Sequence, residues 1–468
     1  MDDVLELDDI QGLVARGYGG LPYACFLPMS IHDPIPARRV LSGWAEQVTS
    51  ARGRPDTEAT NIAFTAAGLC ALTGWANLPE GFSYAFRDGM TSEYRSRFLG
   101  DLEGDDPRRW RWGGPSTAPV HLVVLVYGQT AEWLRARADA VVAEAHGGGL
   151  EVVARLESDE LSNREPFGFV DSISQPPIAG LSGARDASSA IRAGEFVLGY
   201  RNEYGQLTER PSVPAAADPK GYLARDDDGS ADLGRNGTYL VLRQIEQDVA
   251  GFWRYLEDES RLPDGTVDRW RRDHLAAKIV GRWASGTPLV LAPDEDDPAA
   301  SRSNDFRYHA IDPDGLACPI GAHIRRVNPR DALEPAPGTD RSIQVNNRHR
   351  LLRRGRSYRT EQAVEGVPAE ERGLYFVCLN ANLARQYEFI QHTWINNPMF
   401  NGRYGETDPL VGIRHGGGDT FTEPARPVRH RHRKLPQFVG VRGGAYFFLP
   451  GLSALQYLTS STTAKGLS

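Results

Sequence analysis

Residues 121–155 read HLVVLVYGQTAEWLRARADAVVAEAHGGGLEVVAR, and this stretch decides the type of fold. Its first seven residues form an apolar, β-branched run that is typical of a buried strand. Thr130 is a helix-capping residue, and the amphipathic stretch from there to Ala145 predicts a helix. The glycines at 147–149 end that helix, and EVVAR at 151–155 predicts a second strand. The segment is therefore predicted as a β-α-β unit.

The same pattern of a strand followed by a helix recurs on both sides of this unit. Upstream, we predict strands at 23–31 and 61–65 and a helix at 38–48. Downstream, predicted strands at 238–244, 374–380 and 445–450 are each followed by a helical pattern, at 245–257, 383–395 and 451–458. Two similar sets predict an α+β protein of two ferredoxin-like halves (dimeric α+β barrel type). Each half would be an antiparallel sheet with helices packed on it.

The chain has 468 residues, more than one hydrophobic core of roughly 250–300 residues usually organises. We predict an N-terminal half at 1–180, a polar connecting region at 181–237 and a C-terminal half at 238–468. A hydrophobic share of 40% and a net charge of -8 are typical of an ordinary globular protein and do not favour nucleic acid as a partner.

The four cysteines are far apart and form no CxxC pair, so neither a zinc cluster nor a disulfide scaffold is indicated. The N-terminus MDDVLELDDIQG is acidic, unlike a secretory signal, and no apolar run of about 18 residues could cross a membrane. We therefore expect a cytoplasmic protein.

Most of the eleven histidines lack a metal-binding context. His430 and His432 lie in RPVRHRHRKLP, a basic run that is typical of a solvated surface segment. Since we find no HExxH or HxH-plus-carboxylate pattern, we predict no zinc or non-haem iron site.

His323 stands in a different setting, CPIGAHIRRVNPRD at 318–331. The small residues Gly321 and Ala322 would let a flat, bulky group approach the imidazole, and the arginines that follow could pair with anionic substituents. A haem meets both requirements, because its iron takes a His ligand and its propionates take Arg. On these residues alone, a structural histidine remains the alternative.

The segment PFGFVDSISQPP at 166–177 places one carboxylate, Asp171, among apolar residues. An acidic residue in apolar surroundings either has a charged or hydrogen-bonding structural partner or has a catalytic role. FRDG at 86–89 looks similar but lacks the preceding Gly and the SQP tail, so we predict a structural role for Asp88. In RLLRRGRSY at 350–358, we predict an exposed basic edge for Arg350, Arg354 and Arg356.

Together these motifs resemble the dye-decolourising (DyP-type) haem peroxidases over nearly the whole chain. The resemblance rests on NIAFTAAGL, FRDGMTSEYRSRFLGD, YLVLRQIEQDVAGFW, CPIGAHIRRVNPRD, LYFVCLNANLARQYEFIQHTWINNP and GGAYFFLPGLSAL, in that order. It implies haem b in the C-terminal half. It also implies a peroxidase that reduces hydrogen peroxide and oxidises dyes, phenols or other small organic reductants by single electrons.

The resemblance also assigns roles to individual residues. His323 matches the proximal iron ligand, Asp171 the distal acid of the family's GxxDG motif, and Arg353 the distal arginine. Arg330 matches the arginine that binds the haem propionates, and Asn328 lies beside it in the sequence. Leu374 and Phe376 match the apolar side chains that line the distal pocket. The acceptor that orients the proximal imidazole is expected near PQFVGVRGG at 436–444.

Ser172 departs from the motif, which has Gly at this position. An alternative function therefore stays open: a haem-binding, haem-handling or sensing protein with weak peroxidase activity. An interaction module without cofactor would require His323, Arg330, Arg353 and Asp171 all to be coincidental. The sequence is compatible with a homo-oligomer but does not indicate one.

Overall fold

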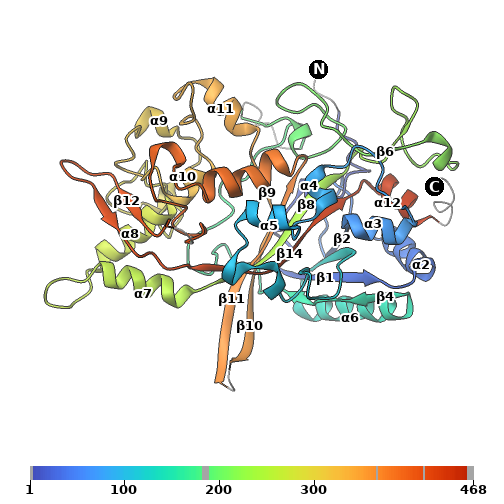
Figure 1. The fold of residues 1–468 in the computed structure, drawn as a ribbon, viewed down its shortest axis with the longest axis horizontal. Coiled ribbons are helices and arrows are strands. Elements are labelled where there is room, and N and C mark those ends of the chain that lie inside the picture. The colour runs from blue at the N-terminus through green and yellow to red at the C-terminus, as the bar shows by residue number, and fades with distance from the viewer. Residues whose placement is uncertain (1–3, 182–188, 365–366, 415–416, 461–468) are drawn as a thin grey trace.

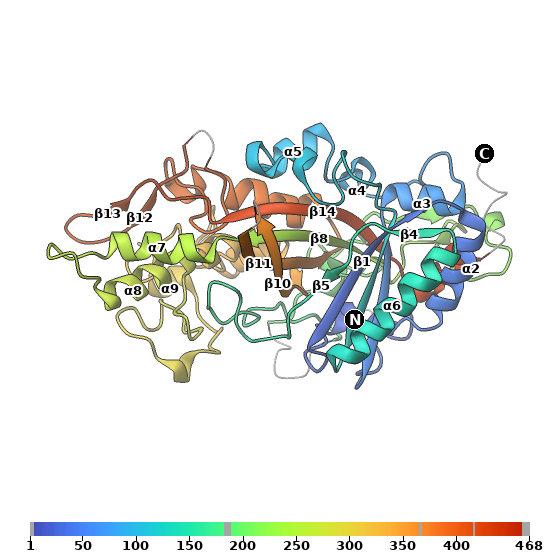
Figure 2. The same cartoon turned by 90° about the horizontal axis from the view of Figure 1, so that it is seen from below.

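The fold is built on one ten-stranded antiparallel sheet that runs through the whole molecule (Figures 1 and 2). It is seen in a computed structural model that describes residues 4–181, 189–364, 367–414 and 417–460. Its path is β10-β11-β8-β14-β2-β3-β1-β4, with β5 added on β1 and β9 on β11. The strands are β1 Tyr23–Ile31, β2 Glu58–Phe64, β3 Leu122–Gly128, β4 Leu150–Val152, β5 Leu156–Glu157, β8 Thr238–Gln247, β9 Leu352–Arg353, β10 Arg356–Val364, β11 Val367–Asn380 and β14 Val439–Leu449.

Helices cover this sheet and build the lobe beside it. They are α1 Gly12–Ala15, α2 Pro34–Ala45, α3 Ala66–Thr73, α4 Tyr84–Asp88, α5 Glu93–Leu99, α6 Ala131–Gly147, α7 Val249–Glu259, α8 Arg269–Val280, α9 Tyr308–Ile311, α10 His323–Val327, α11 Asp340–Asn347 and α12 Leu452–Thr459. Two π-helical segments, η7 Ala384–Glu388 and η8 Ile390–Ile395, follow β11. Two small hairpins complete the fold: β6 Ser212–Val213 with β7 Ala231–Asp232, and β12 Phe421–Glu423 with β13 His430–His432.

The two halves of the sheet have the same strand order. The N-terminal half reads β2-β3-β1-β4 and the C-terminal half β10-β11-β8-β14, so in each the first strand lies between the third and the fourth. This is the ferredoxin-like arrangement, and it confirms the predicted α+β fold class. The halves join where β14 pairs with β2 through Phe448 and Phe64.

The predicted β-α-β unit is confirmed as β3, α6 and β4. The helix begins after Thr130, whose side chain accepts a hydrogen bond from the backbone N–H of Trp133, and it ends at the glycines. The two strands of the unit do not pair with each other, because β1 lies between them and pairs with both. Figure 2 shows α2 and α6 lying alongside β1.

Two predicted helices differ in detail. The helical pattern at 245–257 begins too early, because β8 continues to Gln247, where it still pairs with β14. The helix α7 starts only after Asp248, which accepts a hydrogen bond from the backbone N–H of Gly251. The helix predicted at 383–395 is present but π-helical.

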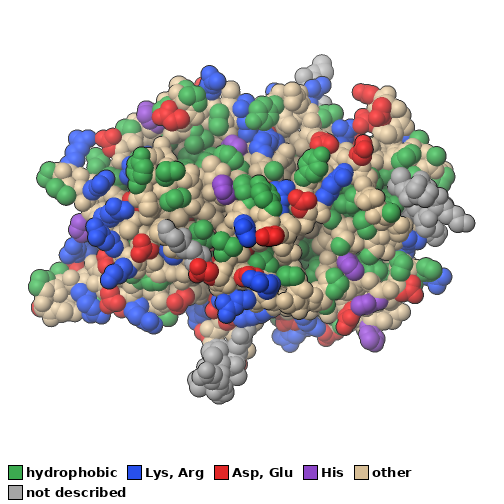
Figure 3. Space-filling model, in the orientation of Figure 1, with side chains coloured by type: hydrophobic (Ala, Val, Ile, Leu, Met, Phe, Trp, Pro, Cys, Tyr) green, Lys and Arg blue, Asp and Glu red, His purple; other side chains and the backbone are tan. Residues whose placement is uncertain are grey.

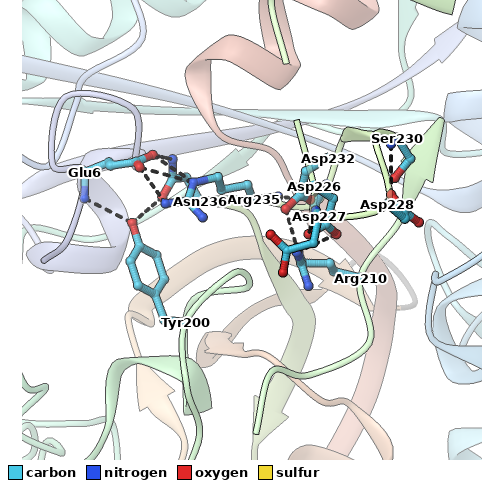
Figure 4. Close-up of polar contacts among 11 residues, drawn as sticks. Glu6, Tyr200, Arg210, Asp226, Asp227, Asp228, Ser230, Asp232, Arg235 and Asn236 are labelled. Atoms are coloured by element: carbon cyan, nitrogen blue, oxygen red, sulfur yellow. Dashed lines mark hydrogen bonds and ion pairs between the residues drawn. The ribbon is translucent and has the colours of Figure 1, made fainter. Parts of the chain in front are cut away.

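The described part of the connecting region 181–237 is folded onto the protein by polar contacts (Figure 4). The guanidinium of Arg235 pairs with Glu6 near the N-terminus. Arg210 pairs with Asp232 and so closes the region on itself. Ion pairs between distant residues, which a polar composition does not reveal, hold this region in place.

The C-terminal helix α12 packs against the N-terminal half. Its Leu455 and Leu458 are fully buried in the same apolar cluster as Leu41 and Trp44 of α2. The chain therefore returns to its first half after completing the second.

Among the described helices, none is long and apolar enough to cross a membrane. All four cysteines carry free thiols.

Candidate active site

A cavity of about 300 Å³ lies where the loop 165–174 meets α10, β11 and the segment 350–353. Its wall is largely apolar, with Phe167, Phe169, Ile245, Val327, Ile390, Leu410 and Val439 among its lining side chains. The cavity is also lined by all seven predicted site residues: Asp171, His323, Asn328, Arg330, Arg353, Leu374 and Phe376. An apolar cavity with a few convergent polar groups is the usual form of a small-molecule site.

His323 is the first residue of the short helix α10. Its Nδ1 lies 2.9 Å from Oδ2 of Asp408, which is fully buried. The other carboxylate oxygen, Oδ1, accepts hydrogen bonds from the backbone N–H groups of Leu410 and Val411. When ionised, Asp408 can accept a hydrogen bond but cannot donate one, so Nδ1 of His323 carries the proton. Nε2 then has no proton, and its lone pair is available to bind a metal ion.

The ionised state of Asp408 is favoured by its neighbours. Burial pushes its pKa upward, but the His323 ring, Arg326 and the Val411 N–H outweigh burial, and the pKa is lowered. The prediction that this acceptor lies near residues 436–444 is wrong. Asp408 comes from the loop before β12, where no apolar periodicity marks its position.

Asp171 and Arg353 lie next to each other in the wall of the cavity, with Oδ1 of Asp171 3.5 Å from a guanidinium nitrogen. The Asp171 side chain is 51% exposed, so the carboxylate among apolar neighbours is not buried but opens toward the cavity. The next residue, Ser172, has a φ of 65°, in the left-handed region that favours glycine. Ser172 thus adopts a backbone conformation that glycine, the residue of the motif at this position, takes without steric strain.

The loop that carries Asp171 is fixed at both ends. The buried carboxylate of Glu165 accepts hydrogen bonds from the backbone N–H groups of Phe167 and Phe169. At the other end, Oε1 of Gln175 accepts the backbone N–H of Arg353. No sequence motif indicates this role for Glu165 or Gln175.

Besides Arg353, four arginines line the cavity. Arg243 is paired with Asp101, whereas Arg282, Arg330 and Arg350 have no such carboxylate partner among the described residues. In the described chain, the hydrogen bonds of these last three arginines go to neutral oxygen atoms such as those of Asn304 and Ser174. Burial lowers the pKa of Arg350 to about 9 and that of Arg282 to about 10, and it also lowers the pKa of Arg330. Buried guanidinium groups without anionic partners are suited to an anionic ligand.

Leu374 and Phe376 both line the cavity, as two residues of one strand face of β11. The intervening Tyr375 belongs to the opposite apolar cluster. Asn328 accepts a hydrogen bond from Asn346 and so holds α11 against the site.

Some predictions about neighbouring residues are wrong. Gly321 and Ala322 do not open the way to His323: a Cβ on Gly321 would touch Glu406 and Phe421, and Ala322 lies in the core. The expected exposed edge of Arg350, Arg354 and Arg356 is also wrong. Arg350 lines the cavity, whereas Arg354 and Arg356 donate to backbone carbonyls of residues 13–18.

The expectation for the basic run at 426–436 holds for His430, which is exposed, but is wrong for His432. The His432 side chain is 7% exposed and lies between the carboxylates of Glu259 and Glu423. An HxH pair and a carboxylate therefore do meet here, although the carboxylate comes from the neighbouring strand.

The chain is similar to known peroxidases over most of its length, although no protein-family model matches it. A dye-decolorizing peroxidase of Exidia glandulosa is 31% identical over 421 residues, which cover 85% of this chain and 75% of the relative. One from Auricularia auricula-judae is 29% identical over 478 residues, 96% of this chain and 86% of that protein.

Solved structures agree with the sequence comparisons. The Auricularia enzyme in complex with imidazole superimposes with a TM-score of 0.78 at 27% identity, covering 97% of this chain and 100% of that one. A dye-decolorizing peroxidase in complex with 2,6-dimethoxyphenol gives a TM-score of 0.76 at 26% identity, covering 98% and 100%. The chain therefore belongs to the dye-decolourising peroxidase family.

Proposed function

We propose that this peroxidase uses haem b, held through Nε2 of His323, to reduce hydrogen peroxide and to oxidise dyes, phenols or other small organic reductants. The observation that carries the assignment is the arrangement of the cavity. A histidine with its Nδ1 fixed by Asp408 shares one apolar cavity with the ion pair of Asp171 and Arg353.

The chemistry of the lining residues fits haem. Its two propionates would supply the anionic partners that Arg330 and Arg350 lack, while Leu374 and Phe376 would contact the apolar ring. Asp408 would raise the basicity of the iron ligand through the Nδ1 hydrogen bond. Bound haem would supply the redox-active iron, a chemistry that side chains alone do not provide.

Asp171 and Arg353 would act on peroxide. The half-exposed carboxylate of Asp171 is free to take a proton from one peroxide oxygen and return it to the other. The Arg353 guanidinium supplies a fixed positive charge beside the carboxylate, where negative charge develops as the O–O bond breaks. The loop contacts of Glu165 and Gln175 hold the two groups in place without entering the reaction.

Three variants of the purified, haem-loaded protein test these roles. His323→Ala should lose the Soret absorbance of bound haem. Asp171→Asn should keep haem and lose about 10²–10⁴-fold in the rate with peroxide. Arg353→Leu should also keep haem and lose about 10²–10³-fold.

The matched control is Asp88→Asn, because Asp88 stands in the similar sequence FRDG but lies outside the cavity. It should leave both haem and turnover unchanged. Full peroxidase activity in Asp171→Asn would overturn the catalytic assignment, and haem retained in His323→Ala would overturn the ligand assignment.

Location in the cytoplasm remains part of this proposal. It is supported by the four free thiols, of which Cys25, Cys318 and Cys378 are buried. Fractionation of the native cells with antibody detection would test it.

A further inference from the structure

The β12–β13 hairpin places three metal-ligating side chains on one face. Glu423 pairs directly across from His430, and His432 follows two residues later on the same side of β13. The ligand atoms of Glu423, His430 and His432 all lie within 4.8 Å of one another. These three residues lie outside the cavity described above.

His432 is oriented as metal-binding histidines are. Its Nε2 lies 2.6 Å from Oε1 of Glu423, and its Nδ1 lies 2.7 Å from Oε2 of Glu259 at the end of α7. A carboxylate on the far nitrogen fixes the ring and leaves the near nitrogen for a metal. His430 is exposed, and its ring stands 5.5 Å from that of His432 at 88°.

The charges on this face suit a divalent cation. Two carboxylates, Glu259 and Glu423, flank the His432 ring. The intervening Arg431 projects from the other face of the strand, where it donates to the carbonyl of Tyr404 and the hydroxyl of Thr420. In Figure 3, Lys and Arg side chains lie among acidic ones at the end of the molecule where Figure 1 draws β12, so Glu259 and Glu423 are the groups that offset the positive charge there.

We propose that Glu423, His430 and His432 bind a zinc ion, with Glu259 as the orienting partner of His432. Two imidazole nitrogens and one carboxylate oxygen are a ligand set that Zn²⁺ prefers, at roughly 2.0–2.2 Å. Mg²⁺ and Ca²⁺ prefer oxygen ligands alone. The metal would replace the proton shared between Nε2 of His432 and Glu423, and a water would complete the tetrahedron.

The site would brace the segment that orients His323. Thr422, beside Glu423, donates hydrogen bonds from its hydroxyl and its backbone N–H to the carboxylate of Glu406, two residues before Asp408. Figure 2 shows the hairpin beside α7, whose Phe252 packs on Phe167 of the Asp171 loop. Zinc would therefore join α7 to the hairpin and stabilise both sides of the cavity from outside.

The test is zinc titration of the full-length, haem-loaded protein after treatment with a chelator. Calorimetry should show one Zn²⁺ per chain, and X-ray absorption at the zinc edge should show a nitrogen and oxygen shell with two imidazoles. His430→Gln and His432→Ala should weaken zinc binding by at least about tenfold, and Glu259→Gln by about 10–100-fold. Added zinc should raise the Tm of the wild type but not that of His430→Gln.

The control variant is His146→Gln, which changes an exposed histidine of α6 far along the chain and should bind zinc like the wild type. Because His430 is exposed, its variant should fold normally, and its Tm without zinc should equal that of the wild type. No zinc binding up to millimolar concentration, or binding as tight as that of the wild type in both His430→Gln and His432→Ala, would overturn the proposal.

Discussion

Ser172 stands where the motif has glycine, and its backbone lies in the left-handed region that favours glycine. A non-glycine residue in the left-handed region costs roughly 1–2 kcal/mol, whereas glycine adds about 0.5–1 kcal/mol of entropy to the unfolded chain. We therefore expect Ser172→Gly to raise the free energy of unfolding by about 0.5–1 kcal/mol, measured by urea denaturation. Ser172→Ala keeps the strain and should match the wild type; a Gly variant less stable than the Ala variant would contradict this account.

Asp408 governs the electron density on the His323 ring. In Asp408→Asn, a neutral amide replaces the carboxylate beside Nδ1, so His323 becomes a weaker donor at Nε2. We expect a more positive iron reduction potential and a loss of about 10–100-fold in haem affinity or activity. Spectroelectrochemistry of the haem-loaded variant measures the potential, and an unchanged value would show that Asp408 only positions the ring.

At the scale of elements, the Asp171 loop depends on one buried carboxylate. Glu165 uses two oxygens to accept the backbone N–H groups of Phe167 and Phe169. In Glu165→Gln, the amide NH₂ must face one of these donors, which leaves a buried N–H unpaired. We expect a loss of about 1–3 kcal/mol in the free energy of unfolding and a slower reaction with peroxide. Equal stability in the variant would mean that the loop is held elsewhere.

Glu165 also makes stability depend on pH. Burial raises its pKa above the ordinary 4.5, against the opposing bonds from Gln247 and the backbone. The folded state therefore binds more protons than the unfolded state, so stability falls as pH rises from 4.5 through the raised pKa. Urea midpoints across this range should show the slope in the wild type and a smaller slope in Glu165→Gln. The same slope in both proteins would assign it to another group.

Elements with strong local signals could be predicted from the sequence. The apolar run at 23–31 gave the bounds of β1, and the glycines after α6 gave its end. The π-helical form of 383–395 could not be predicted, because its pattern also fits an α-helix. The half-buried position of Arg354 and the buried position of Arg356 depend on carbonyl groups more than 300 residues away in the chain. His432 is buried by Glu259 and Glu423, neither of which belongs to its basic run.

For the whole molecule, the cavity is shared between the two halves. Asp171 comes from the N-terminal half, whereas His323 and Arg353 come from the C-terminal half. The division at 1–180 and 238–468 stays a prediction, and α12 crosses it by packing on α2. Because each half completes the other, we expect the molecule to unfold as one cooperative unit.

Leu455 of α12 tests this cooperativity from a position outside the cavity. Leu455→Ala removes a fully buried side chain from the apolar cluster in which α12 packs against α2, and it should cost about 2–5 kcal/mol. The exposed neighbour Gln456→Ala should stay within about 0.5 kcal/mol of the wild type. Two temperatures are measured for each variant: that of haem release, from the Soret band, and that of the loss of helical circular dichroism. If the halves unfold together, Leu455→Ala should lower both temperatures by the same amount. Haem release at the wild-type temperature in this variant would show that the C-terminal half unfolds independently.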